Sequence, residues 1–233
     1  MASFNPDYCH RFQYQSQGDF AVTFPVGKAV CVGRNYADHA AELNNPVPEE
    51  PLLFIKPATA MAAFSGNLNF PRRFAAAHYE TEMTLLIGKR LCCASIAQAW
   101  DAIAGVGVGL DLTLRALQNS LKEKGHPWER AKAFDGSCVL STFAVPDATT
   151  NLQNLDVRLW RNGELVQNCN TGKMLFPVLP LLCEISRSFT LVPGDVVMTG
   201  TPKGVGELKE GDKLVAELGT LVAAEATVIL END

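Results

Sequence analysis

The sequence has no long run of apolar residues. The longest candidate, Ala102 to Leu114, is interrupted by Asp111, whereas a membrane-spanning helix needs roughly 18 uninterrupted apolar residues. The first residues, among them Asn5, Asp7 and His10, contain no apolar core of a secretory signal. These absences argue against a helical membrane protein, and they predict a cytoplasmic location.

The chain also has no excess of basic charge. It contains 20 Lys and Arg against 25 Asp and Glu, which gives a formal net charge of −5 and a pI near 5.4. Nucleic acids and anionic membranes recruit proteins through clustered positive charge. The balance therefore predicts neither nucleic acid nor membrane as a partner.

Cysteine spacings that indicate a zinc site or a redox pair are missing as well. The seven cysteines form no C-x-x-C pair, and the adjacent Cys92 and Cys93 do not have a zinc spacing. Both, like Cys31, Cys138 and Cys183, have apolar neighbours. We expect buried, reduced thiols of an intracellular protein.

No internal repeat or low-complexity linker divides the 233 residues. We expect a short N-terminal segment over 1–25 and one domain over 26–233. The patterns predict strands at 28–32, 52–55, 79–87 and 105–112, and helices at 96–103 and 176–188. A further helix is expected from Leu114 until Gly125 stops it.

Two local signals refine this reading. Asn35 is expected to cap a short helix that runs to Leu43. Asn162-Gly163, between two strand-like runs, predicts a hairpin. The regular alternation of strand and helix of a doubly wound fold is absent, so the predicted fold class is α+β with much antiparallel or mixed sheet.

Glu80 and Glu82 are the first residues that indicate chemistry. On a strand, residues i and i+2 share a face, so the two carboxylates project side by side. Asp111 lies between Leu110 and Leu112, where an unpaired carboxylate is costly to bury. A hard divalent cation would compensate all three charges. The alternatives are a solvated pair of glutamates, and an Asp111 that caps the following helix.

Two further features have both a functional and a purely structural interpretation. His39 and Glu42 lie three residues apart in a predicted helix, where a carboxylate can orient an imidazole that activates water; surface decoration is the alternative. The glycine-rich stretch 200–206 lacks the pattern of a phosphate loop. It is read as a tight turn or as a carboxylate-binding loop.

Six motifs follow one another along most of the chain. They are GRNYADHAAEL at 33–43, FIKP at 54–57, HYETEMTLLIGK at 78–89, LDLTLRALQ at 110–118, PWERAKAFD at 127–135 and PGDVVMTGTPKGVG at 193–206. In this order they resemble the fumarylacetoacetate hydrolase family, specifically its small, single-domain, acylpyruvase-like branch. The resemblance implies a mixed β-sandwich roll of that family's C-terminal-domain type and a homodimer.

The resemblance also implies roles for individual residues. The expected ligands of Mg²⁺ or Mn²⁺ are Glu80, Glu82 and Asp111. The expected catalytic residues are Lys132 beside the metal and the dyad His39 and Glu42 on a lid helix that follows Arg34. The expected substrate contacts are Arg34, Lys56, Gln118 and Thr201.

The expected reaction is hydrolysis of the C3–C4 bond of an acylpyruvate, a small 2-oxo acid, to pyruvate and a carboxylic acid. His39, oriented by Glu42, would deprotonate the attacking water, and Lys132 would supply a fixed positive charge. The alternatives are decarboxylation or tautomerisation of oxaloacetate, and hydration or isomerisation of 2-hydroxydienoates. A protein that binds metal without turnover is a further alternative. Ala116 and Lys173 depart from residues common in the family.

Overall fold

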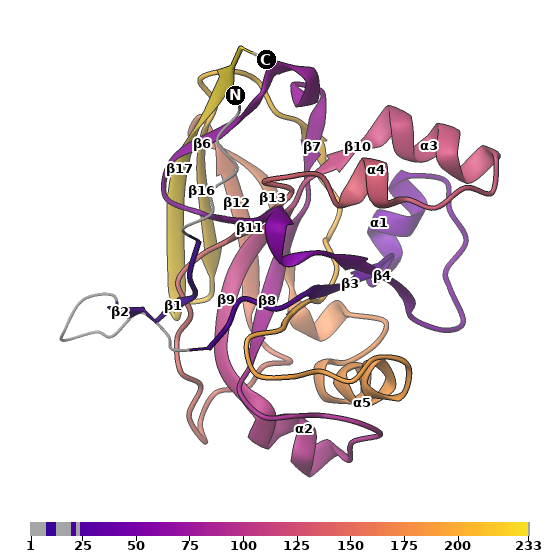
Figure 1. The fold of residues 1–233 in the computed structure, drawn as a ribbon, viewed down its shortest axis with the longest axis vertical. Helices are drawn as coiled ribbons and strands as arrows, with labels where there is room; N and C mark the ends of the chain where they lie inside the picture. The colour runs from indigo at the N-terminus through magenta and orange to yellow at the C-terminus, as the bar shows by residue number, and fades with distance from the viewer. Residues whose placement is uncertain (1–7, 13–19, 22–23, 233) are drawn as a thin grey trace.

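The computed structural model describes residues 8–12, 20–21 and 24–232 (Figure 1). Its largest sheet has the strand order β4-β3-β14-β8-β9-β11-β5 and mixes parallel with antiparallel pairs. In that order its strands are β4 (Leu52–Lys56), β3 (Ala29–Gly33), β14 (Val196–Met198), β8 (Thr81–Ile87), β9 (Ile103–Asp111), β11 (Cys138–Leu140) and β5 (Met61–Ala63).

A second sheet packs against the first, with β12 lying on β8 and β16 on β9. In spatial order it contains β13 (Glu164–Asn170), β12 (Asp156–Arg161), β16 (Lys213–Leu218), β17 (Val222–Glu231) and β6 (Gly66–Pro71). Smaller sheets are formed by β10 (Thr113–Leu114), β7 (Ala77–Tyr79) and β15 (Gly206–Glu207), and by β1 (Arg11–Phe12) with β2 (Phe20–Ala21).

The two faces of β8 have different surroundings, because side chains alternate between the two sides of a strand. Met83 and Leu85 point into the main core, which includes Val157 and Leu159 of the facing sheet. Glu82 has the opposite parity and therefore projects from the other face of β8. The alternation thus buries the apolar half of β8 between the sheets and turns its carboxylate toward the helices.

The glycines of β9 let the backbone of neighbouring strands come close. Gly107 and Gly109 share a face with Asp111, and Gly109 pairs with Glu82. A Cβ on Gly109 would lie 2.6 Å from the carbonyl oxygen of Val139, closer than packing allows. This close approach brings β8 and β11 against β9 beside the carboxylates.

Three helices gather on one side of the large sheet, and two others lie at its far end (Figure 1). The first group is α1 (Ala37–Glu42), α3 (Arg115–Glu123) and α4 (Glu129–Lys132); the second is α2 (Ile96–Ala102) and α5 (Val178–Ser188). Short 3₁₀ turns are η1 (Ala58–Ala60), η2 (Arg72–Phe74) and η3 (Thr171–Lys173). The first group forms the wall that faces Glu80, Glu82 and Asp111.

The predicted α+β class is confirmed, as is the hairpin at Asn162-Gly163, where both residues have positive φ. The predicted cap is wrong: the residue before α1 is Tyr36, which makes no side-chain cap. Asn35 instead bonds through its side chain to the backbone of Phe176 and Thr199. It therefore ties the start of α1 to the segment after β14.

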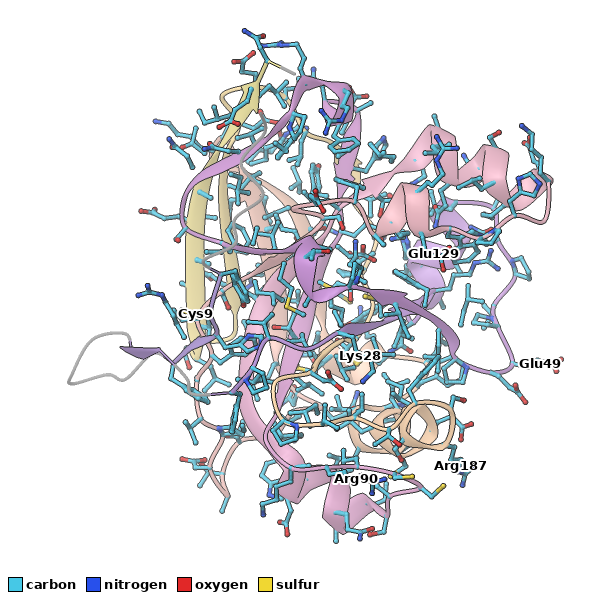
Figure 2. All side chains as sticks on the ribbon, viewed as in Figure 1. Cys9, Lys28, Glu49, Arg90, Glu129 and Arg187 are labelled. Carbon is cyan, nitrogen blue, oxygen red and sulfur yellow. The ribbon has the colours of Figure 1, made fainter. Side chains whose placement is uncertain are left out.

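The prediction of buried thiols holds for Cys31 and Cys138 and is wrong for Cys92 and Cys93, which are exposed. Both lie in the loop before α2, where apolar neighbours in sequence do not produce burial in space. In Figure 2, Arg90 and Arg187 extend from the same end of the molecule.

Within the part of the chain that is described, no helix has the length and apolar character to cross a bilayer. The boundary after residue 25 stays a prediction.

Candidate active site

Three carboxylates converge at the point where β8 begins and β9 ends. The backbone N–H of Asp111 donates to the carbonyl of Glu80 at 2.8 Å, so these residues lie opposite each other, with Glu82 two residues along the same face. One oxygen from each of the three side chains lies within 4.8 Å of the others. All three are buried, Glu82 and Asp111 to 1% exposure. The spacing of Glu80 and Glu82 thus does place them on one buried face, and Asp111 joins them instead of capping a helix.

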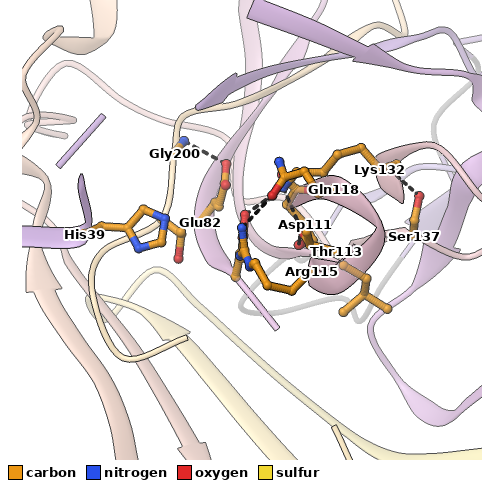
Figure 3. Close-up of polar contacts among 12 residues, drawn as sticks. His39, Glu82, Asp111, Thr113, Arg115, Gln118, Lys132, Ser137 and Gly200 are labelled. Atoms are coloured by element: carbon orange, nitrogen blue, oxygen red, sulfur yellow. Dashed lines mark hydrogen bonds and ion pairs between the residues drawn. The ribbon is translucent and has the colours of Figure 1, made fainter. Parts of the chain in front are cut away.

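Lys132 connects two of the carboxylates (Figure 3). Its Nζ donates to Glu80 Oε2 at 2.8 Å and to Asp111 Oδ2 at 2.7 Å, and it also donates to Thr113 Oγ1 at 2.6 Å. The side chain reaches the cluster from the end of α4 and lies over the ring of Phe54. A buried ammonium group is therefore held at the edge of the acidic cluster.

Lys56 lies behind Asp111, away from the open side of the cluster. Its Nζ is 2.8 Å from Asp111 Oδ1 and donates to the carbonyls of Leu112, Ser137 and Lys132. Its side chain is fully buried. Burial by itself would raise the pKa of Asp111, but Lys132 and Lys56 outweigh it and hold that pKa below its usual value.

Among the residues that the structure describes, Glu82 has no such cationic partner. The backbone N–H of Gly200 donates to its Oε2 at 2.7 Å (Figure 3). Gly200 has a φ of +99°, and a Cβ there would lie 2.6 Å from that of Asn35, so only glycine lets the backbone come this close. Burial, followed by the charge of Asp111, raises the pKa of Glu82 well above its usual value.

This donor set fits a hard divalent cation. All three groups offer oxygen, the ligand atom that Mg²⁺ and Mn²⁺ prefer. The like charges of Glu82 and Asp111 repel each other, and this repulsion raises the pKa of Glu82. A cation held by Glu80, Glu82 and Asp111 would remove that repulsion. The alternative of a solvated pair of glutamates is wrong, because both side chains are buried.

His39 and Glu42 form a pair on α1. His39 Nδ1 lies 3.1 Å from Glu42 Oε2, and the other carboxylate oxygen of Glu42 accepts the backbone N–H of Gly204 at 2.9 Å. Since a carboxylate only accepts, the proton of this contact lies on Nδ1 and leaves the Nε2 lone pair available. Burial lowers the pKa of His39 below its usual value, although Glu42 opposes this shift. The histidine is accordingly neutral at neutral pH.

His39 of the dyad and two of the carboxylates, Glu80 and Glu82, open into one pocket of 130 Å³, which we call the site pocket. Leu52, Phe54 and Trp128 give it an apolar wall. Its polar lining is contributed by Arg34, His39, Asn45, Glu80, Glu82, Arg115, Gln118, Asn119, Lys122, Lys132 and Thr201. The volume is well below the roughly 300–1,000 Å³ typical of pockets for drug-sized ligands, so it suits a substrate of few atoms.

Of the four expected substrate contacts, three line the site pocket. Arg34, Gln118 and Thr201 do so, whereas Lys56 does not. Gln167, which the sequence analysis did not single out, donates to Thr201 Oγ1 at 2.9 Å and holds it in place. We propose that Lys56 acts by positioning Asp111.

Arg115 was also missed by the sequence analysis. It donates to Glu80 Oε1 and, at 2.7 Å, to Gln118 Oε1. Burial lowers the pKa of Arg115 to about 10. The available signal was its spacing: residues i and i+3 of a helix share a face, so a helical Gln118 in the pocket brings Arg115 with it.

The roll of two mixed sheets with a buried, all-oxygen cluster defines a protein with a candidate centre for a divalent metal. The chain belongs to the fumarylacetoacetate hydrolase family: the family model described as "Fumarylacetoacetate (FAA) hydrolase C-terminal" matches residues 28–229. The resemblance read from the six motifs and the predicted roll are thereby confirmed. The chain is an enzyme of this family in its small, single-domain form.

Two relatives with the same named activity are similar to this chain over most of its length. Oxaloacetate tautomerase YcgM of Escherichia coli (strain K12) is 47% identical over 205 residues, covering 87% of this chain and 93% of the relative. Oxaloacetate tautomerase FAHD1, mitochondrial, of Homo sapiens is 40% identical over 194 residues, covering 83% and 88%. Both names favour the alternative of oxaloacetate chemistry over acylpyruvate hydrolysis as the first expectation.

One similar solved structure is that of a hydrolase of an acylpyruvate. The crystal structure of fumarylpyruvate hydrolase from Pseudomonas aeruginosa in complex with Mn²⁺ and pyruvate is similar with a TM-score of 0.86. It is 34% identical, and the match covers 97% of this chain and 98% of that one. A member of the family with this fold thus binds a divalent metal and a 2-oxo acid.

Proposed function

We propose that this protein is a metal-dependent oxaloacetate tautomerase, which interconverts the enol and keto forms of oxaloacetate. The observation that carries the proposal is the arrangement in one small pocket of a buried neutral histidine, a buried ammonium and a carboxylate cluster suited to a divalent cation. The similarity to two oxaloacetate tautomerases supports the choice of reaction. The proposed ligands are Glu80, Glu82 and Asp111, with Mg²⁺ or Mn²⁺ as the cation.

Tautomerisation moves one proton between the enol oxygen and C3 and adds no atoms. Bound at the carboxylate cluster, a divalent cation supplies Lewis acidity that stabilises negative charge on a 2-oxo acid. His39 offers Nε2 to the mobile proton, and Glu42 fixes the ring and compensates the positive charge that the ring gains. Lys132 supplies a fixed positive charge beside the enolate oxygen. Gln118 and Thr201 are proposed to hold the substrate.

The direct test follows the decay of enol-oxaloacetate absorbance. Enzyme stripped with EDTA is compared with the same enzyme after Mg²⁺ is added, and Mg²⁺ without enzyme is the blank. We expect acceleration over the blank only in the metal-loaded sample, because the carboxylates alone carry no Lewis acid. A metal-loaded enzyme that does no better than the blank rejects the proposed function.

The pH profile tests the role of His39. The base form must be neutral, and burial lowers its pKa below the ordinary 6.5. The rate is therefore expected to stay level from neutral pH to below pH 6.5, and to fall only as the pH drops through that lowered pKa. In His39→Ala the rate at neutral pH falls by about 10²–10⁴, Mn²⁺ affinity is retained, and the acidic limb disappears. A limb that survives in the variant assigns the titration to another group.

Acylpyruvate hydrolysis is the second candidate. The observation in its favour is the His39–Glu42 dyad, which is suited to deprotonating water, together with the structural similarity to a fumarylpyruvate hydrolase. Pyruvate release from acetylpyruvate, with Mg²⁺ and after EDTA, measures this activity in the same preparation. A cytoplasmic homodimer remains the predicted physiological state.

A further inference from the structure

The outer part of the site pocket carries more positive charge than the carboxylates require. Near the cluster, Arg115 and Lys132 are paired with Glu80 and Asp111. Arg34 and Lys122 line the same pocket, and within the described residues neither of them has a carboxylate partner. Two cations are thus left over in the pocket, and both are more exposed than the buried Lys132.

Lys122 reaches the pocket because of its place on α3. Arg115, Gln118 and Lys122 are spaced by three and four residues, which puts them on one face of the helix, and all three line the pocket. The ammonium of Lys122 donates to Asn45 Oδ1 at 3.2 Å. Burial and then the charges of Arg34 and Arg115 lower the pKa of Lys122. These cations are therefore close enough to repel one another.

Arg34 is held in the pocket by an uncommon backbone conformation. Its φ is +59°, in the left-handed region that residues other than glycine rarely adopt. Backbone strain of this kind concentrates at binding sites. The guanidinium forms no hydrogen bond or ion pair with any residue that the structure describes, and burial lowers its pKa. A strained, half-buried and unpaired arginine is suited to an anion from outside the chain.

We infer that Arg34 and Lys122 form a carboxylate subsite that makes the enzyme selective for dicarboxylic 2-oxo acids. This rests on the proposed function, because it assigns the distal carboxylate of the substrate to these two cations while the 2-oxo acid end faces the metal ligands. A carboxylate bound at this subsite relieves the repulsion between the two cations, and it accepts charge-assisted hydrogen bonds from them. Lys122 is a specificity residue and takes no part in the proton transfer.

Calorimetry with stable ligands tests the subsite without turnover. Racemic malate and lactate are both 2-hydroxy acids, and malate differs in carrying a distal carboxylate. In the Mg²⁺-loaded enzyme we expect malate to bind more tightly than lactate. Lys122→Met should weaken malate binding roughly 10- to 100-fold, the loss typical of one charged hydrogen bond, and leave lactate within two-fold. Lys122→Arg, which keeps the charge, should restore most of the malate affinity.

Lys124→Met is the matched control, because Lys124 follows α3, is exposed and lies outside the pocket. It removes the same overall charge and should change neither affinity. With oxaloacetate, Lys122→Met should raise KM and leave kcat nearly unchanged. Equal losses for malate and lactate, or no loss for malate, overturn the subsite. Intact malate selectivity in an enzyme that does not tautomerise oxaloacetate supports the subsite and rejects the proposed reaction.

Discussion

Glu82→Gln is expected to abolish metal-dependent turnover while leaving the metal-free protein at least as stable as the unchanged chain. The substitution replaces one of the three charged carboxylate ligands of the metal with a neutral amide. Without metal, however, Glu82 is a buried carboxylate to which no Lys or Arg of the described residues is bonded, and burial and Asp111 raise its pKa. A neutral amide removes that repulsion and still accepts the N–H of Gly200. The free energy of unfolding should be unchanged or higher by roughly 0.5–2 kcal/mol.

Asp111→Asn is the informative comparison. It also removes a charged ligand, so metal binding should be lost as well. Asp111 is, however, bonded to Lys132 and paired with Lys56, and breaking such buried pairs costs about 3–5 kcal/mol. The two variants should therefore behave alike in Mn²⁺ binding and have opposite effects on stability.

Urea unfolding in EDTA measures the stability of both variants, and calorimetry with Mn²⁺ measures binding. Retention of wild-type Mn²⁺ affinity in Glu82→Gln would falsify the assignment of Glu82 as a ligand. A Glu82→Gln protein that is destabilised as much as Asp111→Asn contradicts the difference in charge pairing between Glu82 and Asp111. Both measurements are independent of the substrate.

Lys132→Met is expected to lower kcat by about 10²–10³, the usual cost of one lost oxyanion contact, while the protein still binds metal. The methionine keeps the length and apolar character of the lysine stem and removes the ammonium, which lies over the ring of Phe54. Glu80 Oε2 and Asp111 Oδ2 then lose their shared donor. Metal-free Lys132→Met should be less stable, and Mg²⁺ should raise its melting temperature more than it raises that of the unchanged protein.

The assay is enol-oxaloacetate decay at saturating Mg²⁺, with thermal unfolding recorded with and without the metal. Lys89→Met serves as control, because Lys89 is exposed and outside the site pocket. A Lys132→Met enzyme with wild-type kcat shows that the ammonium only supports the carboxylates. A variant that loses metal binding instead places Lys132 among the groups that shape the metal site.

Much of the site could be predicted from short-range patterns. The alternation along a strand places Glu80 and Glu82 on one face, and the helical spacing brings His39 next to Glu42. Asp111 was recognisable because a carboxylate inside an apolar run needs a partner. The same reasoning was wrong for Cys92 and Cys93, whose burial depends on which segments pack over the loop before α2.

The order of strands and the packing of helices decided the rest. Lys56 and Lys132 are both lysines near apolar residues in the sequence, but one is buried behind Asp111 and the other faces the pocket. Arg34, Asn45 and Lys122 come from separate segments and meet only because α1 and α3 lie on the same side of the large sheet (Figure 1). No local period encodes that meeting.

The sequence by itself therefore determined the family, the fold class and the residue types of the acidic cluster, because these depend on motifs and on neighbours a few positions apart. Only the tertiary structure decided which cations remain unpaired in the pocket. That balance of charge depends on contacts between residues tens of positions apart, and it supports a 2-oxo acid with a distal carboxylate over an acylpyruvate that has only one carboxylate.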